Sequence, residues 1–336
     1  MGKPVPSWRT FISCAGRSVT IRHQKEGLAE DLEIPWPKRL DLFTCEKVRF
    51  RPGDLEPLLA HEKTLHTVDL QGCRFDPGAL DPLAKLSHLR CLSLRDCALS
   101  DEALNWFRGG DSLEVLNLGG NPGCTGRVIR QAEGSPLGNL SLEGTGIQNG
   151  DMAALAAFPH LETLSVSGTA VTGEGLLSLA GNLGLTVLCD HDREGLARFR
   201  AAQRQGWKKT PGPTDDPVCR EAMELVRAFF AASQDPRRER SGFVTQGYLD
   251  YCKAHGFNGV DPEQRVAFRD SREPPYKDCR VVDAERLTGK KVLVYWEKDD
   301  RQLSQYRCLA VRTPEGWRLD KNEWLCFGKW QFYPLE

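Results

Sequence analysis

The sequence lacks a surplus of charge of either sign, because its 45 Lys and Arg residues nearly balance its 46 Asp and Glu residues. A chain without a general basic field has no broad surface for a nucleic-acid backbone, which argues against a nucleic-acid partner. It also lacks a long apolar run. The longest uncharged stretch, 175–189, contains Asn182 and falls short of the roughly 20 apolar residues that a membrane span needs. We therefore expect no membrane segment.

Signals for secretion and for cysteine-based sites are missing as well. Residues 1–18 lack the apolar core of a secretory signal. The twelve cysteines are scattered, and no two of them form a CxxC pair, which excludes zinc ribbons and thioredoxin-type redox sites. The simplest interpretation is a cytoplasmic protein with reduced thiols.

Catalytic motifs are absent too. The chain contains no GxxxxGK[ST] loop, no HExxH and no GxSxG. Its seven histidines show no metal-ligand spacing. We therefore predict no enzyme activity, no cofactor and no metal site.

What the sequence does contain is a repeat. Apolar side chains return at the same places in segments that begin at residues 40, 65, 89, 113, 137, 161 and 185. Apolar fourth and sixth positions alternate like a short strand with one buried side. A second apolar cluster, such as 79–83, suits a short helix. Because one such unit cannot bury its apolar stripe alone, we predict a stacked solenoid.

The pattern L-x-x-L-x-L-x-x-[N/C/T]-x-L resembles the leucine-rich repeat over residues 40–190. The resemblance implies an α/β solenoid with parallel strands on the concave face and short helices on the convex face. It also implies that the ninth residue of each copy bonds the backbone of the turn that follows the strand. Neighbouring coils would bring two cysteines close together, as a reduced pair or, alternatively, a redox pair. The ninth-position residues are Cys73, Cys97, Asn121, Thr145 and Thr169.

Both ends of the solenoid need caps. Residues 1–39 are predicted to form the N-terminal cap region, with a first strand at 19–21. Residues 191–208 are predicted to form a C-terminal cap helix. Its basic side chains indicate a solvated face, with a phosphate-binding patch as the alternative. Proline and glycine in 209–217 then indicate a linker.

Residues 218–336 have a different pattern. A helix is predicted to end near Ser233, followed by a short one around 248–254. Alternating apolar residues from 292 onward then indicate an antiparallel meander, so we predict a small α+β domain with a curved sheet. This order resembles the nuclear-transport-factor-two-like fold, in which helices and a curved sheet form a cone. We interpret Trp296 and its aromatic neighbours as core rather than pocket lining.

The predicted concave face is small and polar, and it carries few charges. We expect it to bind a protein partner, so that the chain acts as a non-catalytic interaction scaffold. The C-terminal domain is a candidate for dimerisation. Two alternatives stay open: an enzyme or small-molecule receptor working in the C-terminal cone, and a substrate-recognition adapter of a ubiquitin-ligase-like complex. The predicted face consists of Thr67, Asp69, Gln71, Ser93, Arg95, Asn117, Ser141, Glu143 and Ser165.

Overall fold

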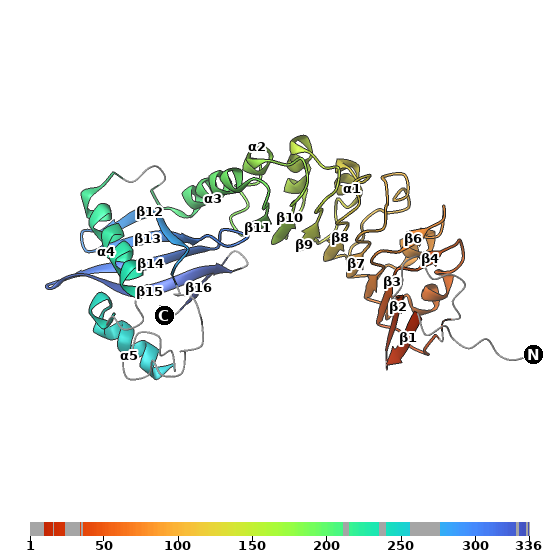
Figure 1. The fold of residues 1–336 in the computed structure, drawn as a ribbon, viewed down its shortest axis with the longest axis horizontal. Helices are drawn as coiled ribbons and strands as arrows, with labels where there is room; N and C mark the ends of the chain where they lie inside the picture. Colours follow the sequence, from red (N-terminus) through yellow and green to blue (C-terminus); the bar gives the residue numbers. More distant parts are fainter. Residues whose placement is uncertain are drawn as a thin grey trace, which may run out of the picture. The chain divides into compact units, whose positions relative to one another are not determined.

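The chain divides into two compact units, residues 1–199 and residues 200–336. The boundary falls within one helix, α3 (Arg193–Trp207) (Figure 1). The structure is a computed structural model, and it describes residues 10–15, 17–23, 34, 36–210, 215–234, 240–255, 276–326, 329–333 and 335.

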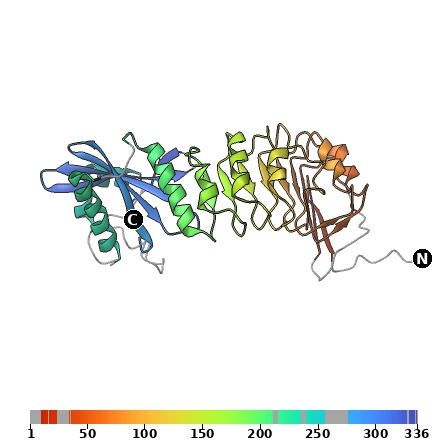
Figure 2. The same cartoon turned by 90° about the horizontal axis from the view of Figure 1, so that it is seen from above.

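The first unit is a solenoid, and we number its coils from the segment that begins at residue 40. Each coil contributes one short strand to a single sheet, and the helices of successive coils lie side by side (Figure 2). An antiparallel strand, β1 (Thr10–Ala15), closes one edge. The parallel strands are β2 (Ser18–His23), β3 (Leu42–Glu46), β5 (Thr67–Asp69), β7 (Cys91–Ser93), β8 (Val115–Asn117), β9 (Asn139–Ser141), β10 (Thr163–Ser165) and β11 (Thr186–Leu188).

Short helical segments form the opposite side of the coils. A two-stranded parallel ladder of β4 (Arg49–Phe50) and β6 (Arg74–Phe75) joins the first two coils there. The helical segments are η1 (Glu56–His61), η2 (Asp81–Lys85), α1 (Gly126–Gln131), η3 (Asn149–Ala157) and α2 (Gly173–Leu177). The predicted α/β solenoid is therefore confirmed.

The last coil departs from the predicted register. The repeat starting at residue 185 places Leu188 opposite Leu164, but the structure pairs Leu164 with Val187. Leu185, Val187 and Cys189 are all buried, and this spacing of two residues sets which side of β11 faces the core. The strand is consequently shifted by one residue.

The second unit is a five-stranded antiparallel meander with helices on one face. The helices α4 (Pro217–Ser233) and α5 (Gln246–Ala254) precede the sheet, as predicted. A short 3-10 turn, η4 (Ser241–Phe243), lies between them. The strands are β12 (Cys279–Thr288), β13 (Lys291–Lys298), β14 (Gln305–Thr313), β15 (Gly316–Cys326) and β16 (Lys329–Phe332).

The C-terminal half of α3 packs on this sheet through buried charges. Arg204 donates to the carboxylate of Glu297, and Lys208 Nζ lies 3.1 Å from a carboxylate oxygen of Asp283. Both cations are 6 % exposed, and Glu297 is 1 % exposed. Arg204 and Lys208 are therefore not part of a solvated face or a phosphate-binding patch, because carboxylates of the same unit already neutralise them, whereas Arg198 of the same helix is exposed.

The predicted linker 209–217 is structured at both ends. The backbone N–H groups of Lys209 and Thr210 donate to Oε1 of Glu285 at 2.6 and 3.2 Å. Asp216 caps α4 by accepting from the N–H of Val218 at 2.8 Å. Residues 211–214 lie outside the described residues. The unit boundary therefore lies inside the predicted cap helix rather than in the linker.

We expect a fragment of residues 200–336 to be more stable than a fragment of residues 214–336. The shorter fragment lacks Arg204 and Lys208, which leaves Asp283 without its cation and Glu297 with Arg280 alone, and breaking a buried pair costs about 3–5 kcal/mol. Urea unfolding followed by tryptophan fluorescence measures the difference. Equal midpoints would show that α3 adds nothing to this unit.

Candidate functional site

A ladder of buried polar side chains supports the turns behind the strands. Asn121 is fully buried, and its Oδ1 accepts from the backbone N–H groups of Cys97 and Leu99, both at 3.0 Å. Its Nδ2 donates to the carbonyl oxygens of Leu94 and Leu118 at 2.8 and 2.7 Å. One amide thus connects the third and fourth coils and fixes their spacing.

Cysteine and threonine occupy the same position in other coils. Cys97 Sγ donates to the Leu70 carbonyl at 3.0 Å, and Cys73 Sγ donates to the Cys45 carbonyl at 3.3 Å. All eleven cysteines whose side chains the structure describes are free thiols. Burial raises the pKa of the Cys97 thiol to about 12, which keeps it protonated at neutral pH.

In the part of the chain that the structure describes, the hydroxyls of the two threonines bond within their own coils. Thr145 Oγ1 donates to the Leu142 carbonyl at 2.6 Å, and Thr169 Oγ1 donates to the Val166 carbonyl at 2.7 Å. The cysteines and the asparagine of this ladder therefore bond a neighbouring coil, whereas each threonine stabilises only the turn of its own coil.

Six of the nine predicted concave residues lie on the strands, where they alternate with the buried leucines or valine, and Gln71, Arg95 and Glu143 each lie two residues after a strand ends. Gln71 and Arg95 are exposed, and most of the others are half-buried. Ser165 departs from the prediction: it is 7 % exposed, and its Oγ has no hydrogen-bond partner in the described part of the chain. The half-buried and exposed members of the predicted face therefore extend from β5 to the end of β9, and Ser165 is not among them.

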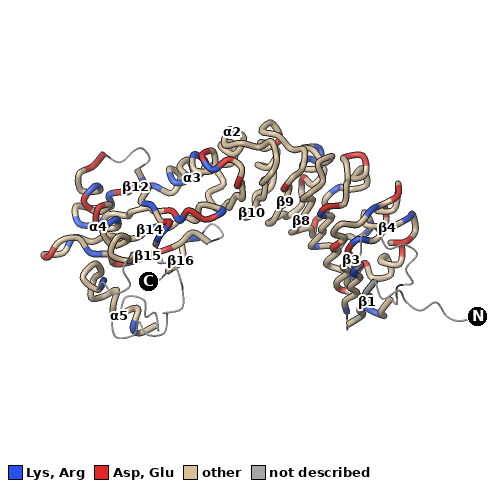
Figure 3. Tube along the Cα trace, in the orientation of Figure 1, with Lys and Arg blue, Asp and Glu red and all other residues tan. Residues whose placement is uncertain are grey.

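The charges on this face are few: Arg95 is in an ion pair, whereas Oδ1 of Asp69 is buried and has no hydrogen-bond partner in the described part of the chain. The guanidinium of Arg95 lies 3.2 Å from the carboxylate of the adjacent Asp96. At the rim, Arg90 and Glu114 form a pair at 2.6 Å. In Figure 3 the strands β8, β9 and β10 are mostly free of coloured charge. Such a face offers hydroxyl and amide hydrogen bonds rather than a strong field.

The cone of the second unit is filled with aromatic side chains. Trp296 is 2 % exposed and stacks on Tyr306 with ring centroids 4.0 Å apart. The indole Nε1 of Trp296 donates to Asn322 Oδ1 at 3.2 Å, and Phe230 packs edge-on against the same ring. Trp296 and its neighbours are therefore core, as the sequence predicted. Glu297 alternates with Trp296 along β13 and so faces away from the cone.

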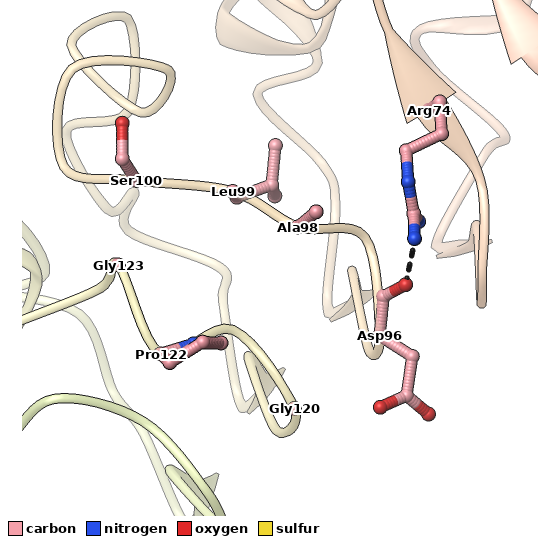
Figure 4. Close-up of a pocket in the computed structure, with 8 residues that line it drawn as sticks. All are labelled: Arg74, Asp96, Ala98, Leu99, Ser100, Gly120, Pro122 and Gly123. Atoms are coloured by element: carbon pink, nitrogen blue, oxygen red, sulfur yellow. Dashed lines mark hydrogen bonds between the residues drawn. The ribbon is translucent and has the colours of Figure 1, made fainter.

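Sequence reasoning missed two adjoining hollows on the turn side of the solenoid. Their volumes are about 400 and 320 Å³, and both are lined by Arg74, Ala98 and Leu99. Figure 4 shows the larger of the two. A signal was present in the sequence: the tenth residue is arginine in the first two coils, then Ala98, then Pro122. Because the arginine of the second coil is followed by smaller side chains at the same position of the next two coils, space remains beside that arginine.

The described residues contain no group of three His, Cys, Asp or Glu side chains that could hold a metal ion. No helix among them is long and apolar enough to cross a membrane.

Families of known proteins match segments of both units of the chain. A family described as a leucine-rich repeat matches residues 85–104 and 159–180, and a family described as an NTF2 fold immunity protein matches residues 237–334. Among solved structures, an internalin from Listeria monocytogenes is similar at 18% identity and a TM-score of 0.33. The match covers 48% of this chain and 44% of that one. No curated protein matches the chain. The predicted repeats and the predicted NTF2-like domain are thus both found.

Replacing Asn121 by alanine should lower the free energy of unfolding by about 3 kcal/mol, because it leaves buried backbone groups of two coils without partners. Asn117→Ala is the matched control, since this side chain accepts a single bond from Gly119 N–H and is half-buried. We expect the control to cost under about 1 kcal/mol. Denaturant titration distinguishes them, and equal losses would contradict the ladder.

Cys97 should resist alkylation by iodoacetamide in the native protein at pH 8. A thiol with a pKa of about 12 is ionised to only about one part in 10,000 there. Peptide mapping by mass spectrometry should find the partly exposed Cys326 labelled first, with Cys97 labelled only after unfolding. Equal labelling rates of the two thiols in the native protein would contradict the structure.

Proposed function

We propose that this chain is a non-catalytic, cytoplasmic protein that binds a protein partner through the concave strand face of its leucine-rich repeats. Solenoids present extended concave surfaces that suit binding to other macromolecules. The observation that carries the proposal is the row of half-buried polar side chains repeated on consecutive strands from β5 to β9. The free thiols suit a reducing compartment.

The C-terminal domain supports a second candidate. Its match to the NTF2 fold immunity proteins favours a domain that binds and neutralises a toxin. Some immunity proteins form complexes with nucleases that are among the tightest known. The filled cone favours recognition by the outer surface of the domain over chemistry inside it. Dimerisation through this domain stays a prediction.

Charge-reversal variants of the full chain can separate the two candidates. Asp69→Arg combined with Glu143→Arg changes the concave face. The matched control, Asp81→Arg combined with Glu102→Arg, makes the same charge change at exposed sites away from the strands. A third variant, Tyr251→Arg, alters α5 at a side chain that is 43% exposed.

We expect a partner co-purified with the wild type to be lost with the concave variant and kept with the other two. Quantitative mass spectrometry of the co-purified proteins measures this. Retention by the concave variant together with loss by Tyr251→Arg would transfer the function to the C-terminal domain.

A further inference from the structure

The turn side of the solenoid has a gap in its backbone bonding. Arg74 N–H donates to the Val48 carbonyl at 2.9 Å and joins the first and second coils. Asp101 N–H donates to the Gly123 carbonyl at 3.2 Å and joins the third and fourth. Along residues 74–76, the described chain makes no backbone bond to the third coil. There the Arg74 guanidinium donates to the Asp96 carbonyl at 2.8 Å instead.

The third coil cannot extend the β4–β6 ladder. In that coil Ala98 stands at the position that Arg49 and Arg74 occupy in β4 and β6. Its φ is +54°, which lies outside the range of an extended strand. Its methyl group also leaves open the space that a longer side chain would fill. The hollows described above occupy this gap.

The gap leaves one edge of β6 open. The backbone N–H groups of Arg74 and Asp76 both point to the first coil. The Asp76 N–H donates to the Phe50 carbonyl at 2.9 Å. Because successive peptide groups of a strand alternate in direction, the N–H and C=O of Phe75 face the hollow. No hydrogen bond within the described chain reaches either group. An open strand edge is a template for an added strand.

The same hollow holds a positive charge without a carboxylate partner. Arg49, at the equivalent position of the first coil, lies 2.8 Å from the Asp76 carboxylate. Arg74 meets only backbone carbonyls in the part of the chain that the structure describes, those of Cys73 and Asp96. The Asp96 carboxylate points away from it (Figure 4). A guanidinium fixed in this way matches a carboxylate in both charge and shape.

We propose that this hollow is a second binding site, which takes an extended peptide segment bearing an Asp or Glu side chain. The segment adds as a strand beside β6 and bonds the N–H and C=O of Phe75. Its carboxylate binds the Arg74 guanidinium, and the side chains of Ala98 and Leu99 form an apolar floor. The site lies on the turn side of the coils and is independent of the concave face.

A pair of synthetic peptides tests this with the full chain. The probes are N-acetylated, C-amidated Thr-Val-Glu-Val-Thr and its Gln analogue, titrated to millimolar concentrations by NMR. We expect the Glu peptide to bind about tenfold more tightly than the Gln peptide, since a charge-assisted bond is roughly twice as strong as a neutral one. Hydrogen exchange at the Phe75 amide should slow on binding. Equal affinities, or shifts confined to the concave strands, would overturn the proposal.

Two arginine variants supply the matched comparison. Arg74→Met should abolish the preference for Glu over Gln, whereas the double variant Arg49→Met with Asp76→Asn should keep it, because it removes an ion pair whose two charges already cancel. Arg74→Lys retains the charge without the planar fork and should keep part of the preference, which separates charge from misfolding. A preference lost equally in both methionine variants, or no binding of either peptide to the wild type, would refute the site.

Discussion

The first unit depends on one constraint: a coil of about 24 residues cannot bury its own apolar stripe. Each coil therefore stacks on its neighbours, and Val68, Leu92 and Leu116 pair in register with at most 1 % exposure. The fully buried Asn121 then fixes the distance between two coils by bonding the backbone of both. Stability, strand register and surface pattern all follow from this stacking.

Regular stacking also decides where binding surfaces can arise. On the strand side the coils from β5 to β10 carry mostly small polar side chains at equivalent positions, so this face has few charges. On the turn side the sequence is less regular. The change from Arg74 to Ala98 at equivalent positions interrupts the bonding between coils and creates a hollow with an open strand edge. A position at which the sequence departs from the repeat can thus give one place on the solenoid a binding specificity that the other coils lack.

The second unit uses a different means of stabilisation. One face of its sheet is covered by α4 and α5 over an aromatic core, and the other face receives the buried Arg204 of α3 and Lys208, which follows that helix. Burying such ions is costly unless they are paired. Glu297 meets this need by binding both Arg204 and Arg280. The units divide between Phe199, whose side chain is fully buried, and Arg200, whose guanidinium donates to the Gln302 carbonyl and to Gln203 Oε1.

Sequence alone determined the repeat, the strand side and the order of the C-terminal elements, because periodicities of 24 and of two residues are properties of the chain itself. It could also identify Asn121 as a ladder residue through its place in the pattern. Only the tertiary structure decided the register of β11, the burial of Ser165 and the partners of Arg204 and Lys208. A basic residue on a helix has the same sequence pattern whether water or a distant carboxylate surrounds it. The residues that neutralise these cations lie about 75 to 93 positions away.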